Sequence, residues 1–137
     1  MSADEPLEVA LFGRLIRLAQ QIRHRADAEM ADQDINPAQF FILGLLQRRG
    51  PLAQRDIAAA MRTSASNVSQ LLRKMEASGL VERGSRSATR RTELTDAGRA
   101  AHGRLKPQHD AFIKTQFAGL SEAEQRLMLV WFDRLLA

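Results

Sequence analysis

The sequence predicts a mainly α-helical chain that carries one small β-hairpin, and three observations lead to this prediction. Strong helix formers dominate the 137 residues, whereas there are only 8 glycines and 4 prolines. Apolar residues recur at the helical spacings of three and four along several segments. Between residues 80 and 94, two short strand-like segments instead flank an arginine-rich loop.

A long first helix is expected from about Asp4 to Glu29. One apolar stripe follows helical spacing and consists of Leu7, Leu11, Leu15, Leu18 and Ile22. A second apolar set lies off that stripe and consists of Val9, Phe12 and Ile16. A helix that is apolar on more than one face usually packs against more than one partner.

Two shorter helices follow. Asn36 is a suitable N-cap and Pro37 a suitable first residue for a helix that runs to about Gln47. The segment Arg49–Pro51 ends it, because glycine and proline do not continue a helix. Leu52 is interpreted as a lone apolar residue before a third helix from about Ala53 to Met61.

The fourth helix has the clearest division into two sides. Ser64 is a good N-cap, and Gly79 follows the end of the helix near Ala77. The apolar side is predicted to contain Ala65, Val68, Leu71, Leu72 and Met75. The other side carries groups that can donate to bases and phosphates: Ser66, Asn67, Ser69, Gln70, Arg73 and Lys74.

The hairpin is expected from strands at Leu80–Arg83 and Thr92–Leu94. The loop between them, Gly84–Arg91, has three arginines, no acidic residue and one apolar residue. Such a loop cannot bury itself, so it should project into solvent or onto a partner.

A fifth helix begins at Thr95 with Asp96, and Pro107 is expected to kink it or to divide it into two helices. Ser121 and Glu124 match a capping box that starts the last helix. The six consecutive apolar residues Leu127–Phe132 cover every side of that helix, so a subunit interface is expected.

Charge is distributed unevenly. The chain has a net charge of +4, but its segment 48–91 holds ten basic and three acidic residues and so carries +7. This concentration favours a polyanion as partner, the alternative being a solvated arginine-rich surface.

Composition excludes several classes of protein. With no cysteine there are no disulfides or thiolate metal sites, which is consistent with a reducing cytoplasm. No apolar run reaches the 18 or so residues that a membrane-spanning helix needs, and the acidic start lacks the features of a secretory signal. We therefore expect a cytoplasmic protein without a membrane partner.

Two short helices, a tight turn, an amphipathic helix and a basic hairpin together predict a winged helix-turn-helix. We expect residues 35–95 to form the DNA-binding domain and the terminal helices to form a dimerisation domain from residues 1–34 and 96–137. A helix of this length fits the major groove, and an arginine-bearing hairpin can follow phosphates or enter the minor groove.

The sequence resembles the MarR (multiple antibiotic resistance regulator) family of bacterial transcription regulators. The residues that carry the resemblance are Asn36–Phe40, Arg49–Leu52, Ile57–Ala58, Ser64, Asn67–Ser69, Leu71–Glu76, Gly79–Arg83 and Leu94–Gly98. The resemblance implies a homodimer built from the terminal helices that binds a palindromic operator in double-stranded DNA. It also implies a repressor that small phenolic or other anionic ligands release. The wing departs from the family's usual Asp–x–Arg pattern, because no aspartate lies between Gly84 and Leu94.

The DNA-binding residues are predicted in three groups. Base edges should be contacted by Ser66, Asn67, Gln70 and Arg73. Phosphates should be contacted by Arg55, Arg62, Ser64 and Lys74. The wing should use Arg86, Arg90 and Arg91.

Other sites are less strongly indicated. A small anionic or aromatic effector could be held by Arg14, Arg17, His24 and Arg25, but a solvated helix face is the favoured interpretation of these residues. His102 and His109 are seven residues apart, but no acidic or thiol set completes a zinc site, and neither a cofactor motif nor a catalytic constellation is present. The alternatives to a sequence-specific regulator are a sequence-tolerant architectural DNA-binding protein and a winged-helix module that binds proteins.

Overall fold

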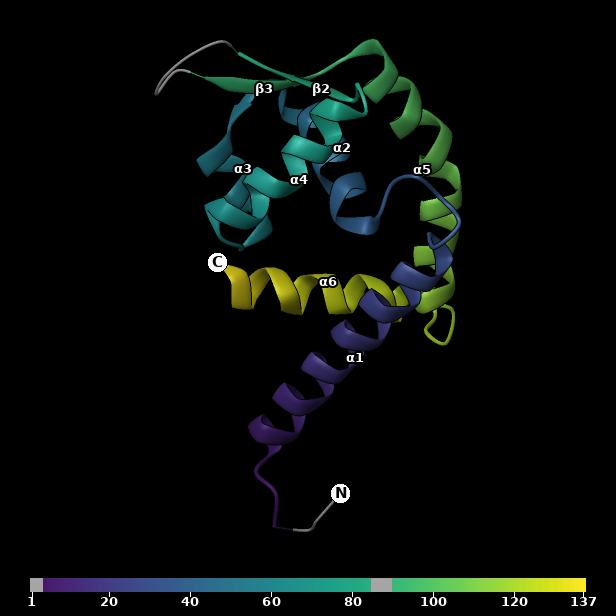
Figure 1. Ribbon diagram of the computed structural model, residues 1–137. Coiled ribbons are helices and arrows are strands. Elements are labelled where there is room, and N and C mark those ends of the chain that lie inside the picture. The colour runs from purple at the N-terminus through teal and green to yellow at the C-terminus, as the bar shows by residue number, and fades with distance from the viewer. Residues whose placement is uncertain (1–3, 85–89) are drawn as a thin grey trace. The chain divides into compact units, whose positions relative to one another are not determined.

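The computed structural model describes residues 4–84 and 90–137, and it divides into two compact units. One unit consists of residues 23–106, and the other combines the chain up to residue 22 with residues 107–137. The helices in the described ranges are α1 (Leu7–Glu29), α2 (Pro37–Arg49), α3 (Gln54–Met61), α4 (Ala65–Ala77), α5 (Asp96–Gln116) and α6 (Glu122–Leu136) (Figure 1). The strands are β1 (Leu52–Ala53), β2 (Val81–Arg83) and β3 (Arg91–Leu94).

The predicted helix starts are confirmed by their caps. The amide of Gln39 donates to Asn36 Oδ1 at 2.8 Å, and the Asn36 amide donates to Gln39 Oε1 at 3.0 Å, which is a full capping box. Ser64 Oγ accepts from the amide of Asn67 at 3.0 Å. Ser121 and Glu124 form the second capping box, and the hydrogen bonds from Ser121 lower the pKa of the Glu124 carboxyl. The stabilisation from that carboxylate is therefore present above the ordinary glutamate range and is lost as the pH falls through the lowered pKa.

One strand was not expected from the sequence. Leu52 and Ala53, interpreted as a lone apolar residue and a helix start, form β1, which pairs antiparallel with β3 through Leu52–Thr92 and Ala53–Arg91. The sheet has the order β1-β3-β2, and Val81 faces Leu94 across the β2–β3 pair. A two-residue strand is too short to show alternation, so only its pairing with β3 reveals it.

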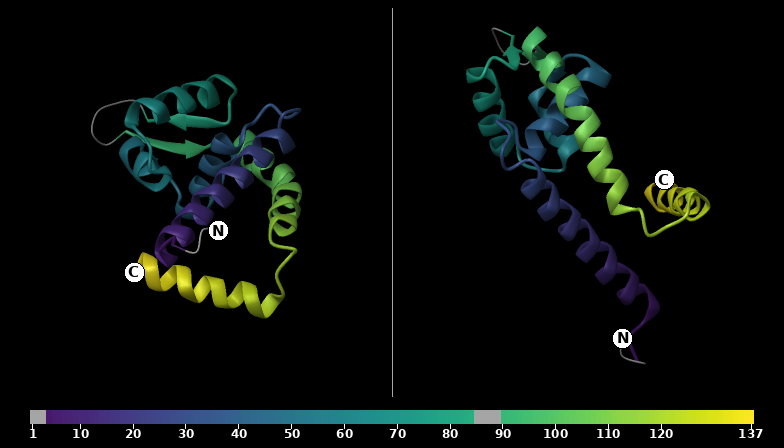
Figure 2. Two further views of the ribbon diagram at one scale, coloured as in Figure 1. Left: turned by 90° about the horizontal axis from the view of Figure 1, so that it is seen from below. Right: turned by 90° about the vertical axis from the view of Figure 1, so that its right-hand side faces the viewer.

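Of the two alternatives expected for the fifth helix, its division into two helices is corrected, whereas a kink at Pro107 stays a prediction. Pro107 lies inside α5, which Figure 2 shows as one continuous helix. Proline removes a single donor, the one that would reach the carbonyl of Gly103, and the turns on both sides keep their own bonds. The division between the two compact units nevertheless falls beside this proline. The functional division into 1–34, 35–95 and 96–137 differs from this contact-based division and stays a prediction.

The unit of residues 23–106 encloses a continuous apolar core. The side chains of α2, α3, α4, β2 and β3 meet there, with α4 packed against α3 and β2. Its largest fully buried members are Ile42, Leu43, Ile57, Val68, Leu72, Met75 and Val81. Burying each such side chain stabilises the fold by about 1.5–3 kcal/mol.

In the other unit, large apolar side chains are exposed. On α1 they are Leu7, Val9, Leu11, Phe12, Leu15, Ile16 and Leu18, so both apolar sets expected on this helix face outward except at half-buried Ile22. On α6 they are Leu127, Leu129, Val130, Trp131, Leu135 and Leu136. No helix in the described ranges is long and apolar enough to cross a membrane.

The start of α5 is tied to the turn between α4 and β2. Thr95 Oγ1 donates to the carbonyl of Gly79 at 2.6 Å, and the Thr95 amide donates to the carbonyl of Leu80 at 3.1 Å. Gly98 donates its amide to Thr95 Oγ1 at 3.0 Å. A Cβ at Gly98 would overlap the carbonyl oxygen of Leu80, so only glycine lets the helix lie this close to the turn.

Replacing Gly98 by alanine should therefore destabilise the protein by about 1–3 kcal/mol, because the added methyl forces α5 away from the turn. Gly103→Ala is the matched control, since a Cβ there meets nothing within 4 Å and alanine favours the helix by about 0.8–1 kcal/mol. Chemical denaturation of both variants measures the difference. Equal stability of the two variants would contradict the close approach at Leu80.

Candidate nucleic-acid interface

The orientation of α4 is set by its buried side. Val68, Leu72 and Met75 are fully buried, whereas Gln70 and Arg73, on the opposite side, are exposed. The structure differs from the predicted division at two residues. Ala65, expected on the buried side, is exposed at the first turn, and Ser69, expected on the polar side, is half-buried. Since the core fixes the rotation of the helix about its axis, the polar side must face outward.

The turn between α3 and α4 holds the two helices together. Gln54 Nε2, at the start of α3, donates to the carbonyl of Ala65 at the start of α4 at 3.0 Å. Arg62 closes α3 in the left-handed conformation, with φ 52° and ψ 49°. It is the only non-glycine residue with positive φ in the described part of the chain. A residue with a side chain is less stable in the left-handed conformation by about 1–2 kcal/mol. The backbone of this turn is therefore strained, and a glycine would relieve the strain.

The side chain of Asn67 is held beside this turn. Its amide Nδ2 donates to Thr63 Oγ1 at 3.0 Å, while its backbone amide donates to Ser64 Oγ. The amide group of Asn67 is thereby oriented at the first turn of α4, where the positive end of the helix dipole also attracts phosphate oxygens.

Arg83 links the hairpin to α4 and was not singled out from the sequence. Its Nη2 donates to the carbonyl of Ser69 at 3.3 Å, and its backbone amide donates to Glu76 Oε2 at 3.3 Å. Its Nε atom is buried and makes no hydrogen bond with the described residues. The alternation of a strand could have revealed this position, because Arg83 lies two residues after buried Val81 and so shares its inward face.

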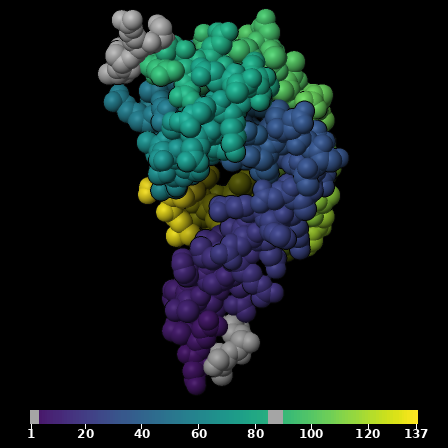
Figure 3. Space-filling model, viewed as in Figure 1, coloured from purple at the N-terminus to yellow at the C-terminus, as the bar shows by residue number. Residues whose placement is uncertain are grey.

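The predicted DNA-binding residues that the structure describes all lie in the unit of residues 23–106. The ten described members of the set are all exposed: Arg55, Arg62, Ser64, Ser66, Asn67, Gln70, Arg73, Lys74, Arg90 and Arg91. Arg86 lies outside the described residues. In the space-filling view the teal residues form one continuous surface of this unit (Figure 3).

The predicted effector residues are not gathered in the same way. Arg14, Arg17, His24 and Arg25 are all exposed on α1, and the boundary between the two compact units falls between Arg17 and His24. Arg14 donates to the carbonyl of Ala10, one turn earlier on its own helix, at 3.3 Å. The structure thus gives these residues no common site within one unit.

The two histidines of α5 have separate surroundings. His102 stacks on Phe40 of α2 with ring centroids 5.2 Å apart, and its Nε2 lies against Gly44. His109 Nδ1 lies 3.5 Å from Asp110 Oδ1. Among the residues that the structure describes, no three histidine, aspartate or glutamate side chains are grouped as a metal site would require.

Comparison with known proteins adds an independent finding. A sequence model of the MarR family matches residues 33–92, which begin just before α2 and end within β3. An HTH-type transcriptional regulator of Bacillus cereus is 28% identical over 126 residues, covering 91% of this chain and 86% of the relative. The HTH-type transcriptional repressor MdtR of Bacillus subtilis is 28% identical over 110 residues, covering 78% of this chain and 71% of MdtR.

The fold also matches solved structures. The S. aureus MepR–DNA complex superposes with a TM-score of 0.77 and 28% sequence identity, covering 96% of this chain and 98% of the MepR chain. The matches are transcription regulators and not enzymes. The mainly helical architecture with a small antiparallel sheet is the winged helix-turn-helix expected from the sequence.

The strained turn gives a prediction that separates stability from binding. Arg62→Gly should stabilise the fold by up to about 1 kcal/mol, because glycine adopts the left-handed conformation without cost. The same change should weaken binding to duplex DNA, because it removes an exposed cation next to the first turn of α4. Arg62→Lys is the control that keeps the charge and the strain. Thermal unfolding and a salt-controlled DNA titration measure the two effects. A glycine variant that binds DNA as tightly as the wild type would exclude a phosphate contact at this position.

Proposed function

The chain belongs to the MarR family of transcription regulators, and we propose that it is a sequence-specific repressor that binds a palindromic operator as a homodimer. The observation that carries this proposal is the orientation of α4. Its apolar side is buried in the core, and its exposed side offers a hydroxyl, two amides and a guanidinium within two helical turns. That set suits base edges in a major groove.

The surroundings of α4 support binding to a duplex. Exposed cations lie near α4: Arg55 on α3, Arg62 in the turn between α3 and α4, and Lys74 on α4 itself. In the hairpin, Arg90 precedes β3 and Arg91 is its first residue. Cations on both sides of a groove-reading helix can fix its register by contacting phosphates. Arg83 links that hairpin to the carbonyl of Ser69, so the hairpin and the helix would approach DNA as one surface.

The exposed apolar residues of α1 and α6 support a homodimer. Leu135 and Leu136 are 80% and 77% exposed, and Phe12 is 65% exposed. A second copy of the chain could cover such side chains through a two-fold interface. Two copies would present two α4 helices to the half-sites of a palindrome, one helical turn apart.

The proposed regulator represses transcription while it is bound to its operator, and a small anionic or aromatic ligand releases it from the DNA. The match to MdtR, a repressor, supports repression. Arg14, Arg17, His24 and Arg25 remain candidates for the effector, with the exposed, solvated face of α1 as the alternative.

An architectural protein that binds any duplex is the second candidate. The concentration of arginine over residues 48–91 would serve it equally well. Titration with a duplex selected by the protein from a random library, and with an unselected duplex, distinguishes the two candidates. A regulator should prefer the selected duplex by at least about 10³-fold, whereas an architectural protein should not. A winged-helix module for proteins would bind neither duplex with a steep salt dependence.

Arg73→Ala should weaken binding to the selected duplex by about 1–3 kcal/mol and should relax specificity at one base pair of each half-site. The reason is that Arg73 is exposed on the polar side of α4, three residues from Gln70. The measurement is a competition titration with single-base variants of the selected duplex.

Lys74→Ala is the matched control on the same helix. If Lys74 contacts phosphate, Lys74→Ala should weaken binding equally on all sequences. Because the proposed dimer loses two such contacts, the slope of log affinity against log salt should become less negative by about 2. If Arg73→Ala behaved in the same uniform way, Arg73 would be a phosphate contact and not a base contact.

The dimer is tested on the exposed side of α6. Leu129→Glu combined with Leu136→Glu should convert a dimer of twice the 15.3 kDa chain mass into a monomer, because buried carboxylates would disrupt an apolar interface. Arg134→Glu, an exposed charge change on the same helix, is the control. Light scattering reports the mass, and the monomer should lose specific DNA binding. A wild-type chain that is monomeric while bound to a palindrome would contradict the proposed interface.

A further inference from the structure

The turn between α3 and α4 fixes the position of Thr63. The amide of Arg62 donates to the carbonyl of Ala59 at 3.2 Å, and the amide of Thr63 donates to the carbonyl of Ala58 at 3.1 Å. With Arg62 in the left-handed conformation, these two hydrogen bonds form a Schellman motif that closes α3. The backbone of Thr63 is therefore tied to the end of α3, and the residue is half-buried there.

Thr63 in turn orients the carboxamide of Asn67, the third residue of α4. The Nδ2 atom of Asn67 donates to Thr63 Oγ1 at 3.0 Å. One of the two side-chain N–H groups is thus occupied, while Oδ1 and the second N–H make no hydrogen bond with a described residue. Asn67 is exposed, so this free edge of its carboxamide is accessible from outside the fold.

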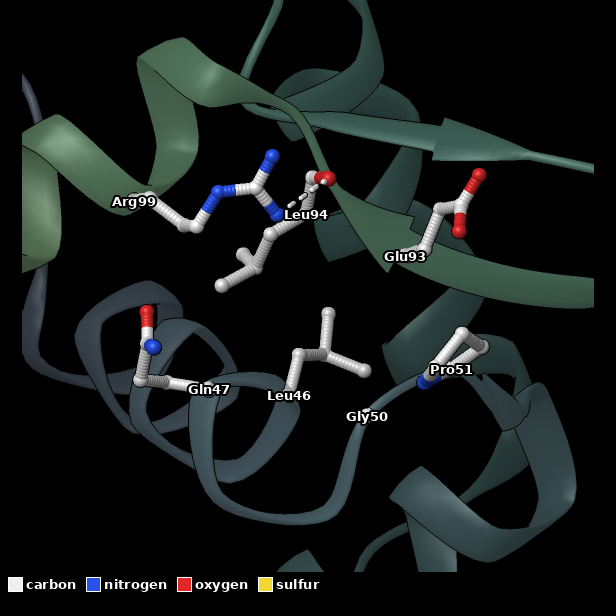
Figure 4. Close-up of a pocket in the computed structure, with 7 residues that line it drawn as sticks. All are labelled: Leu46, Gln47, Gly50, Pro51, Glu93, Leu94 and Arg99. Atoms are coloured by element: carbon white, nitrogen blue, oxygen red, sulfur yellow. Dashed lines mark hydrogen bonds between the residues drawn. The ribbon is translucent and has the colours of Figure 1, made fainter.

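The polar side chains at the apolar corner of α2, β3 and α5 are arranged differently. Figure 4 shows Arg99 donating to the carbonyl of Leu94, and the same guanidinium pairs with Asp96 Oδ1 at 2.6 Å. Glu93 and Leu94 are consecutive residues of a strand, so their side chains leave opposite faces of β3. The oriented polar edge that is still free therefore lies at the first turn of α4 and not at this corner.

The direction of the hydrogen bond to Thr63 decides which base the carboxamide of Asn67 suits. A free carbonyl oxygen accepts, so it matches the exocyclic amines that adenine and cytosine present in the major groove. Together with the neighbouring N–H donor, it matches adenine at both N6 and N7, which is the bidentate pair of asparagine with adenine. The reverse orientation, with Oδ1 towards Thr63, would present two donors and would suit guanine.

We propose that Asn67 reads an adenine in the major groove of each half-site, and that Thr63 is the positioning residue that selects this base. The inference rests on the proposed function, because it requires α4 to lie in a major groove, where the N-terminal residues of such a helix contact base edges. The strained conformation of Arg62 then has a role in recognition. It places Thr63 where its hydroxyl accepts from Asn67.

The positioning role is measured without DNA, from the NMR signals of the Asn67 side-chain amide protons in the full chain. Thr63→Val keeps the shape of the side chain and removes the hydroxyl. One of the two proton signals should therefore move upfield, because its hydrogen bond is lost. Thr63→Ser keeps the hydroxyl and is the matched control. An unchanged signal in Thr63→Val would overturn the positioning role.

The base preference is measured by competition titration with single-base variants of the selected duplex. The wild-type chain should prefer adenine over guanine at one position of each half-site by at least about fivefold, the lower limit for a bidentate pair. Asn67→Ala should abolish the preference at that position alone. Thr63→Val should reduce it at least about twofold, since a lost hydrogen bond has an effect of this size or larger, whereas Thr63→Ser should retain it.

Two base analogues at the same position identify the atoms in contact. 2-Aminopurine still pairs with thymine but has no amine in the major groove, and 7-deazaadenine lacks the N7 acceptor. Each analogue should weaken binding of the wild-type chain at least about twofold, because each removes one hydrogen bond of the pair. Neither should weaken binding of Asn67→Ala further.

Three results would overturn the inference. A preference for guanine at the position that depends on Asn67 would mean that the carboxamide has the reverse orientation, and a preference for cytosine or thymine would exclude the bidentate pair. An equal loss of affinity on every duplex in Asn67→Ala would make Asn67 a phosphate contact. If the wild-type chain had no sequence preference at all, the proposed function would itself fail, whereas the NMR measurement would still decide whether Thr63 orients Asn67.

Discussion

The burial of one side of α4 is the constraint on which the rest of the candidate interface depends. Val68, Leu72 and Met75 are fully buried against a core that includes Ile57 of α3 and Leu43 of α2. A helix of 13 residues is marginal by itself in water, so this packing both stabilises α4 and fixes its rotation. Once the rotation is fixed, the polar side has a single direction in which to face.

The hairpin depends on the same helix through its C-terminal turn. Gly98 lets α5 approach the carbonyl of Leu80, and Thr95 bonds to Gly79. Arg83 reaches back from β2 to the carbonyl of Ser69 in the middle of α4. Movement of α5 or β3 would therefore be transmitted to the base of the hairpin.

Apolar side chains serve two different purposes in this chain. Between residues 23 and 106 most of them are enclosed by a core, with Phe41 exposed, whereas on the first turns of α1 and along α6 they are exposed. Exposed leucine, phenylalanine and tryptophan side chains at this density are unfavourable in water unless another surface covers them. The proposed homodimer gives them that surface, and it would also set the spacing of the two α4 helices.

The sequence by itself determined the elements whose signals are local. Asn36, Ser64 and Ser121 marked three helix starts through side-chain caps, and the spacing of Val68, Leu72 and Met75 marked the buried side of α4. These features depend on residues three or four apart, which a linear pattern contains. The exposed positions of Gln70, Arg73 and Lys74 on α4 followed from the same periodicity.

Tertiary structure decided the features that join distant residues. The strand β1 exists because Leu52 pairs with Thr92, forty residues later, and two residues alone carry no alternation. The link from Arg83 to Ser69 and the close approach of Gly98 to Leu80 likewise arise only when separate elements pack together. Helix caps and amphipathic faces are set by neighbours along the chain, whereas pairing, close approach and pockets are set by neighbours in space, and a single sequence records only the first kind directly.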